Sequence, residues 1–229
     1  IVACDGKHSI ARSACGIDVD GGAYEGTFAM ADFPDTTPFR QDAAVFLNPA
    51  GLVESFPLPG GTRRWVVRRY AGATGEPTAD EIAATIWMRT GFHVPAGEAH
   101  GLSGFVAERW LASRLSHGTL ALAGDAAHVV SPIGGQGMNL GWLGAADLAR
   151  TLGPVLRAGG DPTEALAANA SRRRRIARAA ARRAELNMWL GRPTTRPQQR
   201  DRLVRALLGG PCRNALARSF TMHNLELGV

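Results

Sequence analysis

The residue types that could do chemistry gather in one stretch, Gly-Asp-Ala-Ala-His-Val-Val-Ser-Pro-Ile-Gly-Gly-Gln-Gly-Met-Asn, at positions 124–139. Its acid, Asp125, follows the apolar residues 119–123 and so lies at the carboxyl end of a predicted buried strand. Open α/β sheets place their ligands at this end of the strands. A carboxylate there can accept a hydrogen bond from a ligand hydroxyl, and we expect it to be a buried acceptor.

The glycines and the helix that follow this acid suit a flat ring that gains negative charge. Because glycine has no Cβ, Gly134, Gly135 and Gly137 would let the backbone approach such a ring closely. A nearly uncharged helical pattern then runs from Gly137 to about Leu152. The free N–H groups at its start, together with the positive end of the helix dipole, would stabilise an anion.

A second polar stretch begins at Asp5-Gly6, after the apolar start of the chain. It predicts the end of a buried strand, a tight turn and a short helix with Ser9 as its N-cap. His8 and Arg12 can both donate hydrogen bonds to an anion. Taken alone, Asp-Gly followed by Ser is also an ordinary turn that leads into a helix cap.

Together the two stretches resemble the DG and GD motifs of the class A flavoprotein monooxygenases, the aromatic hydroxylase family related to p-hydroxybenzoate hydroxylase and the ubiquinone-pathway hydroxylases. The resemblance implies that Asp125 bonds the ribityl chain of FAD and that residues 132–139 lie against the isoalloxazine ring. It places the backbone N–H groups of Met138 and Asn139 at the pyrimidine edge of that ring. The alternative, glycines that serve only close packing, does not account for the acid, His, Pro and Asn in this order.

The same resemblance assigns the N-terminal turn to the region between FAD and the nicotinamide cofactor. Asp5 and Gly6 would shape the loop, while His8 and Arg12 would meet the pyrophosphate of NAD(P)H. The complete set of implied cofactor-binding residues is Asp5, Gly6, His8, Arg12, Gly124, Asp125, Pro132, Gly134, Gly135, Gly137, Met138 and Asn139. No side chain is a convincing general acid or base, so the sequence assigns no catalytic residue.

The middle of the chain predicts strands that are broken by turn residues. They cover residues 23–32, 42–47, 52–58, 64–70 and 105–111, with helices expected at 78–89 and 165–184. The first four strands read as an antiparallel meander. The predicted fold is α/β, in part α+β: a partial FAD/NAD(P)-binding Rossmann-like domain with an inserted antiparallel-sheet substrate domain and C-terminal helices. The expected division is 1–20 and 113–160 for the FAD-binding domain, 21–112 for the substrate domain and 161–229 for the C-terminal helices.

The nucleotide-binding half of the family pattern has no counterpart in this sequence. A strand followed by a GxGxxG turn normally holds the ADP pyrophosphate. We therefore expect these 229 residues to be the C-terminal portion of a longer enzyme and to be inactive in isolation.

Composition is that of an ordinary globular protein, with 45% apolar and 20% charged residues. No apolar run approaches the length of a membrane span, and no secretory signal is visible. The three cysteines lack CxxC spacing, which favours reduced thiols and a cytoplasmic location. We expect neither a metal site nor an HExxH or P-loop site.

The net charge of +6 comes almost entirely from arginine, since Lys7 is the only lysine. An arginine-rich helical pattern at 172–183 could contact nucleic-acid phosphates. It lacks interleaved aromatic residues and any helix-turn-helix signature, so a solvated helix face with no nucleic-acid partner is the better interpretation. Asp125, His128 and Ser131 contain the letters of a hydrolase triad but lie on one short loop without a GxSxG elbow.

The resemblance implies an FAD-dependent monooxygenase that uses NAD(P)H and O₂. A flavin C4a-hydroperoxide would hydroxylate an aromatic, quinone-like or polyketide-like small molecule, while the protein positions and shields the cofactor. The alternatives are another flavin oxidoreductase on the same scaffold, such as a reductase or epoxidase, and an inactive fragment or interaction module. The sequence leaves open the substrate, the choice of NADH or NADPH and the oligomeric state.

Overall fold

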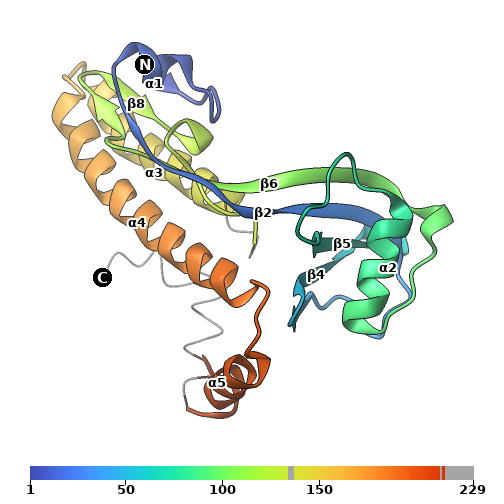
Figure 1. The fold of residues 1–229 in the computed structure, drawn as a ribbon. Helices are drawn as coiled ribbons and strands as arrows, with labels where there is room; N and C mark the ends of the chain where they lie inside the picture. The colour runs from blue at the N-terminus through green and yellow to red at the C-terminus, as the bar shows by residue number, and fades with distance from the viewer. Residues whose placement is uncertain (134–136, 212, 215–229) are drawn as a thin grey trace. The chain divides into compact units, whose positions relative to one another are not determined.

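The fold is known from a computed structural model, which describes residues 1–133, 137–211 and 213–214 (Figure 1). Cys212 lies outside the described residues. The chain divides into two compact units that interleave in sequence. Unit 1 comprises Ile1–Ala23, Glu108–Met188 and Leu207–Val229, and unit 2 comprises Tyr24–Ala107 and Trp189–Ala206.

Unit 1 contains a three-stranded sheet in the order β1-β8-β7. Strand β1 (Val2–Ala3) runs parallel to β8 (Leu120–Leu122), and β7 (Ser116–His117) pairs with β8 antiparallel. The two strands that precede the Asp5 and Asp125 turns therefore run parallel and pair with each other. Among the described residues β1 has no second neighbour in this sheet, and Ile1 and Val2 are 85% and 46% exposed in this chain.

The described residues of unit 1 also form helices α1 (Ile10–Ala14), α3 (Gly137–Arg157) and most of α4, which extends from Thr163 to Leu190. Helices α3 and α4 run side by side in Figure 1. The alanines of α4 make this close approach possible, because their small side chains pack against Leu111, Val130 and Leu140. Helix α3 continues past the predicted end near Leu152, and Pro154 lies within its last turn.

Unit 2 is built on an antiparallel sheet. Strands β3 (Ala44–Asn48), β4 (Gly51–Leu58) and β5 (Thr62–Arg68) form a meander, as predicted. Strand β2 (Val19–Pro34) pairs with β5 instead of with β3, its neighbour in sequence, and so departs from a simple meander. The sheet order is β3-β4-β5-β2-β6-β9, and β2 and β6 each have residues in both units. Strand β6 covers His100–Ala112, and β9 covers His128–Val129.

Helix α2 (Ala79–Thr90) covers one face of this sheet (Figure 1). The side chain of Thr78 accepts a hydrogen bond from the N–H of Glu81 and so caps the start of the helix. Gly91 closes the helix in the left-handed conformation, with φ at 78°. The core between helix and sheet contains Trp65 and Ile82, both fully buried. The remaining elements are α5 (Pro197–Gly209) and three 3₁₀ turns, η1 (Pro59–Gly61), η2 (Ala96–Glu98) and η3 (Gly124–Ala126).

Across the described part of the chain, none of the helices combines the length and the apolar character that crossing a bilayer would require.

Candidate functional site

The parallel pairing of β1 and β8 brings the two polar turns to one edge of the unit 1 sheet. The N–H of Ala123 donates to the carbonyl of Ala3 at 2.9 Å, so both strands end level with each other. Asp5 follows β1, and Asp125 follows β8. The two acid-bearing turns are far apart in the sequence but follow the same end of the sheet, the end at which α/β sheets bind ligands.

The first turn is held by its own side chains. Oδ2 of Asp5 accepts from the N–H of Ala11 at 3.1 Å, and Oγ of Ser9 accepts from the N–H of Arg12 at 3.0 Å. A hydrogen bond from the buried Ser9 hydroxyl, followed by the one from Ala11, lowers the pKa of Asp5. Gly6 has a φ of 82°, which a side chain would strain. Asp5, Gly6 and Ser9 therefore fix where α1 begins.

Arg12 links the two turns. Its Nη2 donates to the carbonyl of Lys7 at 2.7 Å, and its Nη1 donates to the carbonyl of Ala126 at 3.0 Å. The guanidinium is half-buried, and two of its donors are already used by the backbone. His8, by contrast, is exposed. Of the two candidates for an anion, His8 has the freer side chain, while Arg12 holds the two turns together.

The second turn is η3, which begins at Gly124 with a φ of 59°. This left-handed residue turns the chain away from the buried strand, so that Asp125 is exposed in this chain. The expectation of a buried acid at this position is therefore wrong for the chain alone. An exposed carboxylate at the end of the strand is nevertheless accessible and could accept a hydrogen bond from a ligand hydroxyl.

Helix α3 begins soon after this turn, and its first turn contains no acidic residue. Its dipole is therefore not offset there by a carboxylate of the helix itself. Met138 is 63% exposed, and Asn139 and Pro132 are also exposed. A Cβ on Gly137 would lie 3.5 Å from Cγ2 of Val130, an ordinary contact, so packing against the described residues does not demand glycine at this position. Gly134 and Gly135 lie outside the described residues.

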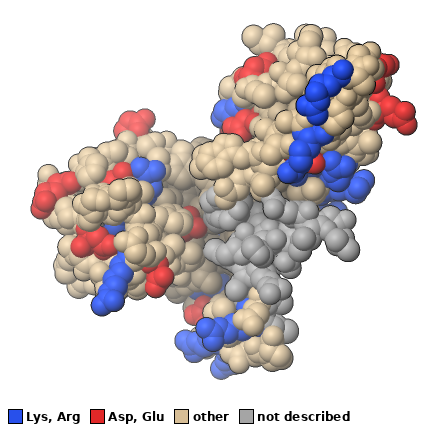
Figure 2. All heavy atoms as spheres, turned by 180° about the vertical axis from the view of Figure 1, so that it is seen from behind, with Lys and Arg blue, Asp and Glu red and all other residues tan. Residues whose placement is uncertain are grey.

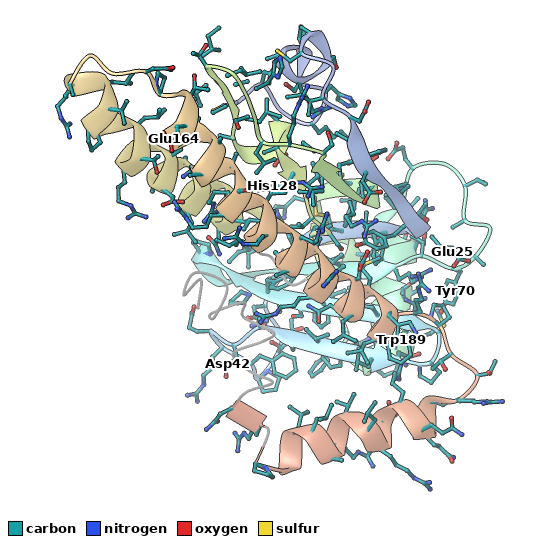
Figure 3. All side chains as sticks on the ribbon, turned by 90° about the vertical axis from the view of Figure 1, so that its left-hand side faces the viewer. Glu25, Asp42, Tyr70, His128, Glu164 and Trp189 are labelled. Atoms are coloured by element: carbon teal, nitrogen blue, oxygen red, sulfur yellow. The ribbon has the colours of Figure 1, made fainter. Side chains whose placement is uncertain are left out.

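His128, to which the sequence assigned no chemical role, is a buried polar group of unit 1. Figure 3 shows His128 beside α4, and its relative exposure is 7%. Burial, and then the nearby charge of Arg173, lowers the pKa of His128 to about 4. The imidazole is therefore neutral at physiological pH. The sequence could not show that His128 is buried, because its burial depends on the pairing of β9 with β6, where His128 lies opposite Leu111.

This pKa predicts a specific loss of stability in acid. Unfolded His128 takes up a proton near pH 6.5, but the folded protein resists protonation down to about pH 4. The contribution of neutral His128 to the free energy of unfolding is thus complete above pH 6.5 and decreases as the pH falls toward 4. Between pH 7.5 and 4.5, the free energy of unfolding should fall by about 2–3 kcal/mol more in the wild type than in His128→Gln. Urea titrations at both pH values measure this difference, and equal losses would contradict it.

The arginine-rich helix is a solvated face only in part. Arg175, Arg178 and Arg182 are exposed, as predicted. Arg172 instead donates to Asp147 at 2.8 Å, and Nε of Arg174 donates to the carbonyl of Ala112 at 3.0 Å. These side chains join α4 to α3 and β6, which the linear sequence could not show.

Surface charge is mixed on the face drawn in Figure 2, where basic and acidic side chains alternate over the described residues. Of the three residues with the letters of a hydrolase triad, Asp125 is exposed whereas His128 and Ser131 are buried, and Oγ of Ser131 accepts from the N–H of Ile133 at 3.3 Å. Among the described residues, no group of three His, Cys, Asp or Glu side chains could hold a metal ion.

Comparison with known proteins gives a consistent result. Residues 1–184 match a family model described as "FAD binding domain". The 12-dehydrotetracycline 5-monooxygenase/anhydrotetracycline 6-monooxygenase of Streptomyces rimosus subsp. rimosus is 30% identical over 225 residues, which cover 92% of this chain and 44% of that protein. The ubiquinone hydroxylase UbiL of Rhodospirillum rubrum is 32% identical over 172 residues, covering 71% of this chain and 39% of that protein.

A solved structure of an aromatic hydroxylase is also similar to this chain. CabE, an aromatic hydroxylase from angucycline biosynthesis, superposes with a TM-score of 0.74 at 28% identity, over 98% of this chain and 46% of CabE. The chain thus spans less than half the length of each of these three relatives.

Proposed function

Since this chain belongs to the FAD binding domain family, we propose that it forms the part of an FAD-dependent monooxygenase that contacts the flavin ring and the ribityl chain. The observation that carries this proposal is the pairing of β1 with β8, which brings the Asp5 and Asp125 turns to one edge of the sheet. Each of the two motifs has an ordinary structural explanation by itself, and the strand pairing supports the proposal that together they form one site.

The residues at this edge fit the chemistry of a flavin. Asp125 is an exposed acceptor for a ribityl hydroxyl, and Gly124 gives the turn its direction. The first-turn N–H groups of α3, at Met138 and Asn139, would donate to the pyrimidine edge of the ring. The proposed ring contacts also include Pro132, Gly134, Gly135 and Gly137.

Bound FAD would supply the redox chemistry that activates O₂, with NAD(P)H as the reductant. The chain's own residues would bind and orient the cofactor and stabilise negative charge at its pyrimidine edge; removal of one comparable donor costs about 10²–10³-fold in rate in other enzymes. We infer a small aromatic or polyketide-like substrate, because relatives are tetracycline and quinone hydroxylases by name. A cytoplasmic location and the functional division at 1–20, 21–112, 113–160 and 161–229 remain predictions.

The test is oxygen incorporation by the full-length enzyme that contains this chain. With NAD(P)H, a tetracyclic or quinone-precursor aromatic and ¹⁸O₂, one labelled oxygen atom should enter the product for each NAD(P)H consumed. Consumption of NAD(P)H without labelled product would indicate a reductase, and a labelled epoxide would indicate an epoxidase. Absence of bound FAD in the purified full-length enzyme would overturn the proposal.

A second experiment examines the nicotinamide cofactor. Because His8 is exposed beside the Asp5 turn, His8→Gln should raise the apparent KM for NAD(P)H several-fold and leave the absorbance of bound flavin unchanged. Arg12→Met should instead weaken FAD retention, because Arg12 donates to the backbone of both turns. His117→Gln, an exposed change on β7, is the control. An unchanged KM in His8→Gln would remove His8 from the nicotinamide site.

A further inference from the structure

Unit 2 has an open pocket of about 540 Å³ at the end of its sheet where β5 finishes. Its described lining residues come from β2, from the loop after β5 and from the segment after α4, and they include Glu25, Arg68, Tyr70 and Arg192. Figure 3 shows Glu25 and Tyr70 close to each other. All of these lining residues belong to unit 2. A pocket of this volume suits a small molecule.

Hydrogen bonds hold two of the segments that line this pocket. Nη1 of Arg69 donates to the carbonyl of Gly75 at 2.8 Å, which folds the loop after β5 back onto the strand end. The N–H of Thr194 donates to the carbonyl of Pro49 at 2.9 Å, which ties the segment after α4 to the turn between β3 and β4. The backbone that carries Arg192 is therefore fixed beside the sheet, although the side chain itself is exposed.

Arg68 is the buried cation of this pocket. Its relative exposure is 6%, and its Nη2 donates to the carbonyl of Glu25 at 2.8 Å. The guanidinium carbon also lies 5.8 Å from the centre of the Phe28 ring. An arginine has five N–H donors, so these contacts orient the guanidinium and leave donors for a ligand.

Positive charge predominates around Arg68. Burial lowers the pKa of its guanidinium; the nearby Glu25 opposes this effect, whereas Arg192 and Arg89 add to it. All three arginines nevertheless stay charged at physiological pH. Among the residues that the structure describes, none of these three guanidiniums forms an ion pair with an acid. An anion in the pocket would therefore relieve repulsion between like charges.

The rest of the lining suits a flat apolar body more than a bare phosphate. The ring of Tyr70 is 43% exposed, and the guanidinium of Arg89 lies 4.6 Å from the centre of that ring and supports it. An exposed, supported aromatic ring can stack on a second ring. A strongly hydrated inorganic ion gains nothing from apolar walls. The small apolar residues that line the pocket are Ala50, Ala71, Ala73 and Pro193.

We propose that this pocket binds a small aromatic carboxylic acid, whose carboxylate meets Arg68 and Arg192 and whose ring lies against Tyr70. Arg68 is the oriented, buried donor, and a carboxylate is the anion that a guanidinium fork matches best. Arg192 adds a second charge at the exposed side of the pocket. Glu25 repels the same carboxylate and so limits its affinity. This site goes beyond the proposed function and does not depend on it.

Isothermal titration calorimetry of the full-length enzyme tests the ligand class with three probes. These are 2-naphthoate, its neutral amide 2-naphthamide, and inorganic phosphate. The acid should bind at least about tenfold more tightly than the amide, which lacks the charge, because a hydrogen bond to a charged group is the stronger kind. It should also bind more tightly than phosphate, which lacks the ring. Equal dissociation constants for acid and amide, or tighter binding of phosphate, would overturn the proposal.

Surface variants with opposite expected signs locate the bound acid. Arg192→Met should weaken naphthoate binding about three- to tenfold and leave the amide unaffected. Glu25→Gln should strengthen naphthoate binding about two- to threefold, because it removes a repelling charge. Arg196→Met changes another exposed arginine of the same segment, outside the pocket lining, and should have no effect. The same affinity in all three variants would place the acid elsewhere, for example at the proposed flavin site, and would overturn the proposal.

The buried arginine provides the last variant. Arg68→Met should remove the preference for acid over amide, with a thermal melt as the check on folding. If this variant does not fold, the three surface variants still decide the matter. An enzyme without FAD would refute the proposed function and leave these dissociation constants as evidence on the pocket, so the two proposals fail separately.

Discussion

Replacing Asp125 with alanine in the full-length enzyme should weaken FAD binding by about 5- to 150-fold, with a smaller effect on the turnover of the fraction that keeps flavin. The carboxylate is exposed at the end of β8, where it can accept from a ribityl hydroxyl. Without it, a ribityl hydroxyl that the bound cofactor takes out of water would lose its acceptor, and an unpaired donor that is shielded from water costs about 1–3 kcal/mol. Equilibrium dialysis of FAD measures the dissociation constant directly.

Two further variants show whether the acid acts as an acceptor. Asp125→Asn keeps a carbonyl oxygen that can accept the same hydrogen bond, so it should retain more affinity than the alanine variant. Asp20→Ala removes an exposed acid from unit 1 outside the two turns and should bind FAD as the wild type does. If Asp125→Ala also binds FAD normally, the carboxylate is not a ligand of the cofactor.

The second large effect is expected in unit 2, where Arg63→Met should lower the free energy of unfolding by about 3–5 kcal/mol. Arg63 is completely buried on β5. Its Nη1 donates to the carbonyl of Asp42 and to Oγ of Ser55, both at 3.1 Å, and its Nη2 donates to the carbonyl of Arg40 at 2.7 Å. Its Nε forms an ion pair with Asp35 at 2.9 Å. Methionine would leave all of these acceptors without their donor.

Chemical denaturation of the purified protein measures this loss. Arg63→Lys should be intermediate, because an ammonium keeps the charge but lacks the planar fork that reaches all four partners. Arg205→Met, on the exposed side of α5, is the matched control and should change stability by less than about 0.5 kcal/mol. A loss in Arg63→Met no greater than in Arg205→Met would show that the loop before β3 holds its shape without the guanidinium.

The elements that sequence reasoning predicted well are those with strong local signals. The turns at Asn48-Pro49 and Pro59-Gly60 separate strands of the meander, and Thr78 marks the start of α2. A strand before each of the Asp5 and Asp125 turns was also predicted, and β1 and β8 lie there. In each case the information lies within a few neighbouring residues or within a recognisable motif.

The contacts that sequence reasoning missed join residues that are distant in the chain. Arg12 contacts the carbonyl of Ala126 across a separation of 114 residues, and Arg173 contacts Leu140 across 33. Nothing in an arginine-rich helical pattern distinguishes the buried Arg173 from the exposed Arg175.

The interleaving of the two units also has a kinetic consequence. The contact of Ile1 with Thr119 spans 118 residues, and closing so long a loop in an unstructured chain costs about 4 kcal/mol of entropy. Most of that loop belongs to unit 2. The chain passes from unit 1 into unit 2 within β2 and returns within β6, and these two strands are adjacent in the sheet. If unit 2 forms first, its two ends are already close together, and the remaining closure is cheaper. Weakening unit 2, as in Arg63→Met, should therefore delay assembly of the Asp5 and Asp125 turns, a delay that stopped-flow refolding would record.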